Sequence, residues 1–193
     1  MESTERKMNE PWANIGITGE SQFIQLLFEP HSKSLVAQFY RSIGDHHGVK
    51  SFYLRAMGDV RYQRLTEMGD SLSYEDAVLS PNGPFVFVNI LQARKERDKH
   101  FGYDWCAIRK IRLPEKEVVG EIRDGQLPGA ANGQRAWISA LQGVSEDGKT
   151  VYCVIGTPGT PTENSTKIRY YLAALDFDGK SFKPLTELTH GAL

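Results

Sequence analysis

Short apolar runs separated by Gly, Pro, Asn or Asp are the main pattern of this chain. The clearest set, between Trp137 and Leu188, reads WISALQGV, TVYCVIG, IRYYLAALDF and SFKPLTEL. These runs are rich in β-branched and aromatic residues, and no long segment shows the 3.6-residue period of a capped helix. The pattern therefore predicts a meander of four short antiparallel strands.

A polar turn between the first two runs recurs along the chain. Its three copies are VSEDGKTVYCV (144–154), LSPNGPFVFVN (79–89) and, more faintly, FEPHSKSLVAQ (28–38). Gly148 and Gly83 favour a hairpin because glycine adopts a positive φ without a Cβ clash, and the Asp or Asn before each tolerates the neighbouring position. His31-Ser32 is a poorer turn pair, so the first copy is degenerate.

The repeat extends beyond the turn. SFYLRAMGDVRYQRLTEM (51–68) aligns with RYYLAALDFDGKSFKPLTEL (169–188), and the middle copy reads WCAIRKIRLPEKEVVGEI (105–122). The inner runs are apolar on both faces, as stacked sheets require, so we expect an all-β chain of three four-stranded antiparallel propeller blades. The expected boundaries are a leader at 1–20, blade 1 at 21–69, blade 2 at 70–124 and blade 3 at 125–190, in one propeller-like domain.

The motifs SEDGKTVYCV, LSPNG and RLTEM, together with YYLAALDFDGKSFKPLTEL, resemble the TolB-like repeat, a relative of the WD-repeat blade. In that family a Ser-Pro-Asp-Gly-type turn joins the first two strands, and a Leu-Thr pair closes the blade. The resemblance covers Gln22 to Leu188, nearly the whole chain. It implies a propeller fold, but because the repeat marks architecture it implies no catalytic residues.

Three blades are too few to close a ring, because closed propellers use about four to eight. Three alone leave two broad apolar blade faces in water. We expect two chains to join head to tail through these faces, as a homodimer with a six-bladed ring. The alternatives are a fragment of a longer propeller and an open wedge stabilised by the leader, which contains Trp12, Ile15 and Ile17.

Composition narrows the function classes. The 193 residues carry a formal net charge of -1 and are 40% hydrophobic, which allows a sizeable core. No global basic field attracts nucleic acid or an anionic membrane, and no apolar run has the length of a signal peptide or a spanning helix. We expect a soluble, cytoplasmic protein. Cys106 and Cys153 lie inside apolar runs, which favours buried free thiols over a disulfide.

The long loops predict a binding side. In a propeller, the loops between second and third strands and those between blades emerge on one side, and here these are the long ones. The candidate ligand-binding residues on them are Asp45, His46, His47, Arg97, His100, Asp104 and Arg135. A solvated polar loop is the commoner explanation for such segments. His46, His47 and His100 are the alternative ligands for a metal, which we do not otherwise expect.

No catalytic or nucleotide-binding motif is present, because GxSxG, HExxH, a phosphate loop and a dinucleotide fingerprint are all missing from the sequence. The aromatic residues Trp105, Trp137, Tyr170 and Tyr171 suit the blade core first and a sugar-stacking platform second. We expect a non-enzymatic scaffold, without a cofactor, that binds a protein, glycan or other small ligand on its long-loop side. The alternative, by family analogy, is a carbohydrate-active lyase or hydrolase with a histidine or metal site at the ring centre.

Overall fold

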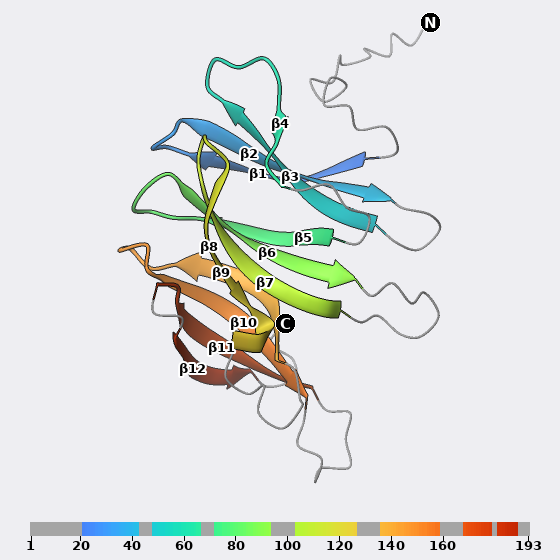
Figure 1. Cartoon of the computed structure of the whole chain (residues 1–193), viewed down its shortest axis with the longest axis vertical. Coiled ribbons are helices and arrows are strands. Elements are labelled where there is room, and N and C mark those ends of the chain that lie inside the picture. Colours follow the sequence, from blue (N-terminus) through green and yellow to red (C-terminus); the bar gives the residue numbers. More distant parts are fainter. Residues whose placement is uncertain are drawn as a thin grey trace, which may run out of the picture.

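Three antiparallel sheets, each formed by four consecutive strands, are stacked one above another (Figure 1). The computed structural model describes residues 21–42, 48–66, 72–93, 103–126, 136–158, 168–178 and 181–188. Blade 1 contains β1 (Ser21–Glu29), β2 (Ser34–Ser42), β3 (Gly48–Ala56) and β4 (Gln63–Arg64). Blade 2 contains β5 (Leu72–Leu79), β6 (Phe85–Ala93), β7 (Tyr103–Arg112) and β8 (Glu117–Arg123), followed by the 3-10 helix η1 (Asp124–Gln126). Blade 3 contains β9 (Trp137–Val144), β10 (Thr150–Pro158), β11 (Ile168–Asp176) and β12 (Ser181–Leu188).

This architecture confirms the predicted fold class of three four-stranded antiparallel blades. The second strand of each blade explains the stacking. Val36 and Ala37 are neighbours in β2 and point to opposite faces of the sheet, yet both are fully buried. Val86 and Phe87 in β6 behave in the same way. A sheet with one wet face would alternate between apolar and polar residues, so β6 requires a neighbour on each face. The outer side of β2 is covered by residues of blade 1 itself, since Phe39, Tyr53 and Tyr62 pack with Ala37.

Two hydrophobic clusters fill the spaces between the blades. The cluster between blades 1 and 2 includes Val36, Phe52, Leu54, Val86, Val88 and Ile90. The cluster between blades 2 and 3 includes Phe87, Cys106, Ile108, Val151, Cys153 and Ile155. Both cysteines are free and buried there, which confirms the prediction from the sequence. Successive side chains of β6 thus pack alternately on blade 1 and on blade 3.

The three turns between first and second strands use different chemistry. Gly83 and Gly148 have φ values of 142° and 71°, which confirms the two predicted glycine turns. Blade 1 has no glycine there, and Lys33 takes the left-handed conformation with φ of 51°. The buried carboxylate of Glu29 supports this turn by accepting the backbone N–H groups of His31 and Ser32 at 2.9 and 2.5 Å. A side-chain cap therefore replaces the missing glycine.

Neighbouring turns are also hydrogen-bonded to each other. His31 Nε2 donates to the carbonyl oxygen of Pro81 at 3.2 Å, and Asn82 Nδ2 donates to the carbonyl oxygen of Asp147 at 2.9 Å. The two donors occupy the same place in successive turns. Each of the first two blades therefore sends one side chain to the turn of the next blade.

Candidate functional site

The strands that flank the long loops end on one side of the stack (Figure 1). The six strand ends are Ser42 and Gly48 in blade 1, Ala93 and Tyr103 in blade 2, and Pro158 and Ile168 in blade 3. We call this side the loop edge. The short turns between first and second strands lie on the opposite side, because each second strand runs from its turn to the loop edge.

The candidate ligand-binding residues depend on these loops. Those that lie outside the described residues are Asp45, His46, His47, Arg97, His100 and Arg135. Asp104 belongs to β7, but its side chain is also outside the description. All seven stay predictions. Within the described part of the chain, no group of His, Cys, Asp and Glu side chains is arranged to hold a metal ion.

A polar cluster beside the loop edge bridges blades 1 and 2. Lys50 Nζ in β3 donates to Glu75 Oε2 in β5 at 2.5 Å, and Ser73 Oγ donates to Glu75 Oε1 at 2.5 Å. Ser73 Oγ also accepts the backbone N–H of Lys50 at 3.2 Å. The three residues, which we call the junction cluster, therefore hold one another in place. The side chains of Lys50 and Glu75 are still 33% and 24% exposed, so the cluster is in contact with solvent.

A β-bulge explains how β5 presents Glu75. Tyr74 and Asp76 pair with successive residues of β6, which leaves Glu75 as the extra residue between them. Gln38, which is 2% exposed, donates from Nε2 to the carbonyl oxygens of both Tyr74 and Glu75 at 2.8 Å. The buried amide of blade 1 thus fixes the bulged backbone of blade 2 directly under the junction cluster.

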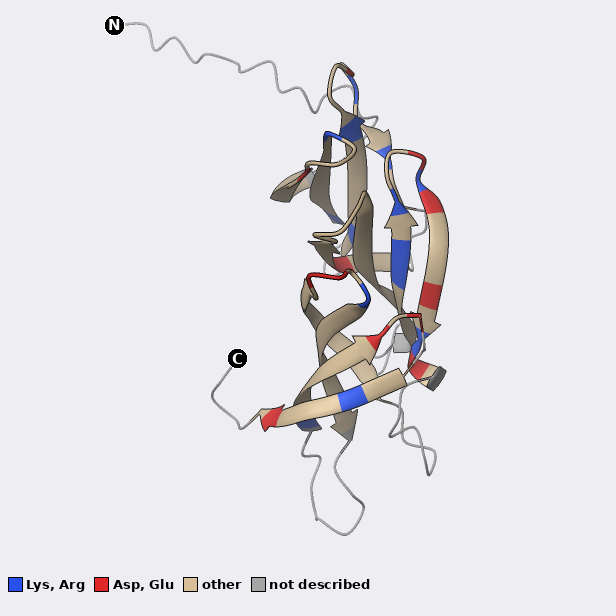
Figure 2. Cartoon of the chain, turned by 90° about the vertical axis from the view of Figure 1, so that its left-hand side faces the viewer, with Lys and Arg blue, Asp and Glu red and all other residues tan. Residues whose placement is uncertain are grey.

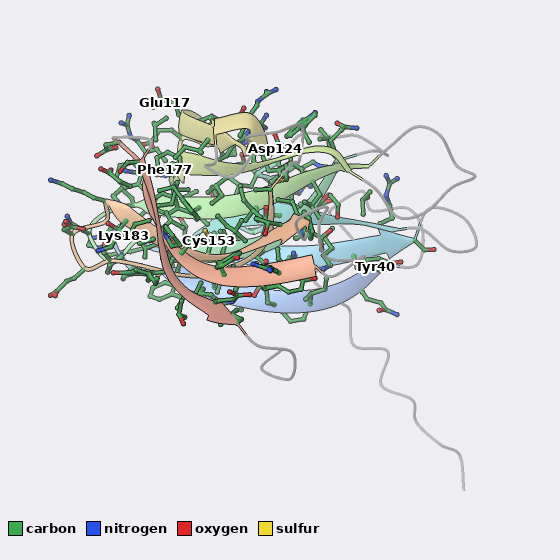
Figure 3. The ribbon with its side chains drawn as sticks, turned by 90° about the horizontal axis from the view of Figure 1, so that it is seen from below. Tyr40, Glu117, Asp124, Cys153, Phe177 and Lys183 are labelled. Atoms are coloured by element: carbon green, nitrogen blue, oxygen red, sulfur yellow. The ribbon has the colours of Figure 1, made fainter. Side chains whose placement is uncertain are left out.

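Blades 1 and 2 each carry a half-buried aromatic ring near the loop edge. The ring of Tyr40 covers Gly48, where an added Cβ would lie 2.1 Å from the ring. Figure 3 looks along the stack and places Tyr40 at the loop edge, away from Phe177. Trp105 is half-buried against the cluster between blades 1 and 2, and the guanidinium carbon of Arg123 lies 4.8 Å from the centre of its ring. Tyr40 is paired with Lys50 in the register of blade 1, whereas Trp105 lies on β7, two strands from Glu75 in blade 2.

Blade 3 carries a second aromatic pair at the loop edge. Trp137 and Tyr170 meet edge to face with their centroids 6.4 Å apart. The Trp137 ring covers Gly156, where an added Cβ would come within 2.3 Å of it. Trp105, Trp137, Tyr170 and Tyr171 are all half-buried. Trp105 and Trp137 pack against the two clusters between blades, as expected for blade core.

Charged residues lie mainly on the outer strands and turns (Figure 2). Glu121 in β8 accepts hydrogen bonds from Arg109 at 2.5 Å and from Arg123 at 2.6 Å. Partial burial alone would raise the pKa of the Glu121 carboxyl, but these two arginines hold it below its ordinary value. Lys50 is likewise paired with Glu75. In the described part of the chain, no helix is long and apolar enough to cross a membrane.

The stack ends in two largely apolar sheet faces that no other blade of the chain covers. On blade 1, Leu26 and Phe28 are 47% and 53% exposed, and they lie beside Ala37 and Leu35 of β2. On blade 3, the alternation of β10 turns Tyr152 and Val154 away from blade 2. The blade 1 outer face comprises Leu26, Phe28, Leu35 and Ala37, with Arg55 and Arg64 at its β3–β4 side. The blade 3 outer face comprises Ala140, Tyr152, Val154, Leu172 and Ala174, with Lys183 and Thr186 on β12. Ala37 and Val154 are already buried by their neighbours in the same chain.

A shallow depression at the β3–β4 connection is a weaker candidate. Asp59, Val60, Arg61 and Gln63 line it. Val60 is 86% exposed, so the depression is open to solvent on the outer surface of blade 1. Its volume is about 280 Å³, at the lower limit for a small-ligand site, and its few lining residues do not enclose a ligand.

The junction cluster was not predicted from the sequence because its three residues come from two blades. A signal was present in LSYEDAVL, where two acids interrupt an otherwise strand-like run, and in the Gln of LVAQFY. Neither a protein-family model nor a curated protein matches this chain.

Proposed function

We propose that this chain is a non-enzymatic binding scaffold of the propeller type, and that it binds a neutral, hydroxyl-rich ligand such as an oligosaccharide at the loop edge. The observation that carries the proposal is the junction cluster, with Tyr40 paired to Lys50 beside it. Lys50 and Glu75 offer donors and acceptors, while Tyr40 and Trp105 offer flat apolar surfaces. Sites for small ligands commonly combine apolar walls with a few fixed polar groups.

The charge balance favours a neutral ligand. Lys50 is paired with Glu75, and Arg123 is paired with Glu121 at 2.6 Å. A phosphate or a polyanion would have to displace these carboxylates, whereas a sugar hydroxyl can both donate to Glu75 and accept from Lys50. The C–H face of a sugar ring can at the same time pack on an aromatic ring.

Rigidity supports a binding role as well. Gln38 and the junction cluster fix the β5 backbone before any ligand arrives. Binding groups that are already held in place lose little conformational entropy when the ligand binds. Asp45, His46, His47, Arg97, His100, Asp104 and Arg135 are the proposed contributors from the loops on the same side.

Intrinsic fluorescence provides the test, because the chain has only three tryptophans. A panel of neutral oligosaccharides would be titrated into the wild-type chain and into the Lys50→Met and Trp105→Leu variants. We expect each variant to bind the best ligand about tenfold or more weakly, because each loses a contact worth about 1.4 kcal/mol or more.

Lys149→Met is the matched control. Lys149 lies on an exposed turn between β9 and β10, on the side opposite the loop edge. The Lys149→Met variant should therefore bind the oligosaccharide as tightly as the wild type does. If no oligosaccharide of the panel binds, or if Lys50→Met binds as tightly as Lys149→Met, the proposed site is wrong.

A further inference from the structure

Equivalent positions in the three blades follow one rule. Counted from the first residue of the second strand, the third position is Val36 in blade 1 and Phe87 in blade 2. Val36 packs in the cluster between blades 1 and 2, and Phe87 packs in the cluster between blades 2 and 3. In both cases the third position contacts the next blade. In blade 3 the same position is Tyr152, which lies on the blade 3 outer face.

The opposite face follows the complementary rule. The second position is Val86 in blade 2 and Val151 in blade 3, and both pack on the preceding blade. In blade 1 the same position is Leu35, on the blade 1 outer face. The blade 1 outer face therefore corresponds to the faces of blades 2 and 3 that pack against a preceding blade. The blade 3 outer face has the place of a surface that packs on a following blade.

The two outer faces also differ in shape. Leu26 and Phe28 are large side chains that protrude from the blade 1 outer face and are about half exposed. On the blade 3 outer face, the small residues Ala140 and Ala174 flank Val154 and Tyr152 in the register of the sheet. Protruding side chains on one face can therefore lie against the two alanines of the other, beside Tyr152 and Leu172.

We infer that the blade 1 outer face of one chain packs against the blade 3 outer face of a second copy. The contact is heterologous, and a second identical contact between the same two chains closes a ring of two subunits. The inference rests on the propeller-type scaffold proposed above, but it does not depend on the oligosaccharide site. It identifies the partner of both end faces as another copy of this chain.

The closing contact repeats the geometry of the contacts inside the chain. Positions are again counted from the first residue of each second strand. Inside the chain, the even positions of β6 or β10 face the odd positions of the second strand in the preceding blade. The closing contact joins the even-position face of blade 1 to the odd-position face of blade 3 in the other copy. Figure 3 shows the end of the stack at which blade 3 would receive the second copy. The apolar residues at both ends thus acquire the same kind of neighbour that covers Val36 and Val86 inside the chain.

Paired charge substitutions test the inference. Leu26→Glu damages only the blade 1 outer face, and Leu172→Glu damages only the blade 3 outer face. Mass would be measured by light scattering over a micromolar dilution series, with circular dichroism to verify folding. We expect the wild-type chain at twice its 21.7 kDa mass and each variant alone as a monomer, with dimerisation weakened at least tenfold.

Mixing the two variants is the decisive step. The Leu26→Glu chain keeps an intact blade 3 outer face, and the Leu172→Glu chain keeps an intact blade 1 outer face. An equimolar mixture should therefore form a 1:1 heterodimer through one intact contact, more weakly than the wild type dimerises. Val118→Glu, which changes an exposed apolar residue on β8 of the middle blade, should remain a dimer.

Four outcomes would overturn the inference. They are a monomeric wild type, a wild type that forms a series of larger assemblies, a Leu172→Glu variant that still dimerises alone, and a mixture that stays monomeric. If Leu172→Glu misfolds, Ala174→Glu replaces it on the same face. The oligosaccharide titration on the monomeric Leu26→Glu variant tests the proposed function separately, because the junction cluster lies on the other side of blade 1.

Discussion

The buried amide of Gln38 should contribute strongly to the stability of this chain. Gln38→Leu removes both hydrogen bonds to the carbonyl oxygens of Tyr74 and Glu75 while keeping a side chain of similar size. Each bond contributes about 0.5–1.5 kcal/mol net. The two acceptors stay beneath the junction, so a loss of about 2 kcal/mol in the free energy of unfolding is expected after some compensation from the added apolar surface. For a chain of this size, that corresponds to a Tm lower by about 4–8 °C.

Urea unfolding followed by tryptophan fluorescence measures this loss. Gln142→Leu is the matched control, because Gln142 is exposed on β9 and the same substitution there should leave the unfolding midpoint nearly unchanged. If Gln38→Leu unfolds at the same urea concentration as the wild type, the amide does not hold blade 1 to the bulge of β5. The structural account of the junction cluster would then fail.

Two further predictions concern titratable groups. Burial raises the pKa of Cys106 and of Cys153 to about 12. A thiol reagent at pH 8 should therefore label neither cysteine in the folded chain and both cysteines in urea, and mass spectrometry counts the labels. Labelling of the native chain would contradict the buried placement. Burial also raises the pKa of Asp76. Ionisation of this carboxyl therefore lowers the free energy of unfolding as the pH rises through the pKa that Asp76 has in the folded state. Asp76→Asn, whose amide oxygen can still accept the N–H of Leu141, should therefore be more stable than the wild type at pH 7, with the difference shrinking toward acid in urea unfolding. An advantage that grows on acidification would contradict this sign.

Local patterns were enough to predict the blades. Alternation, turn residues and strand composition are set by neighbours in the sequence, so the four runs of the last unit coincide with β9 to β12. Gly83 and Gly148 show the positive φ that their turns require. The degenerate turn of blade 1 was also predicted, but the side-chain cap that stabilises it was not. The buried Glu29 carboxylate that caps it is a tertiary feature, because its burial depends on how the sheets stack.

The candidate site was less predictable for the same reason. Lys50 and Ser73 are 23 residues apart, and the bulge that presents Glu75 depends on pairing with β6. Charged and histidine-rich loops stand out in the sequence because they are visible as local composition. A polar group inside a strand is a quieter signal. It becomes informative only when the neighbouring blade shows what it binds, as Gln38 does.

The blade contacts inside the chain and the proposed contact between chains differ in their polar ties. At the fifth position of the second strand, Gln38 and Asn89 donate to backbone carbonyls of the next blade, the second at 3.4 Å to Ile138. Val154 has that position in blade 3 and can donate nothing from its side chain. In the turn of blade 3, Asp147 has the position that the donors His31 and Asn82 have in blades 1 and 2, but its carboxylate only accepts hydrogen bonds. The closing contact would therefore depend on apolar burial, which is weaker on cooling. Two copies should consequently separate on dilution or cooling under conditions in which the three blades of each chain stay together.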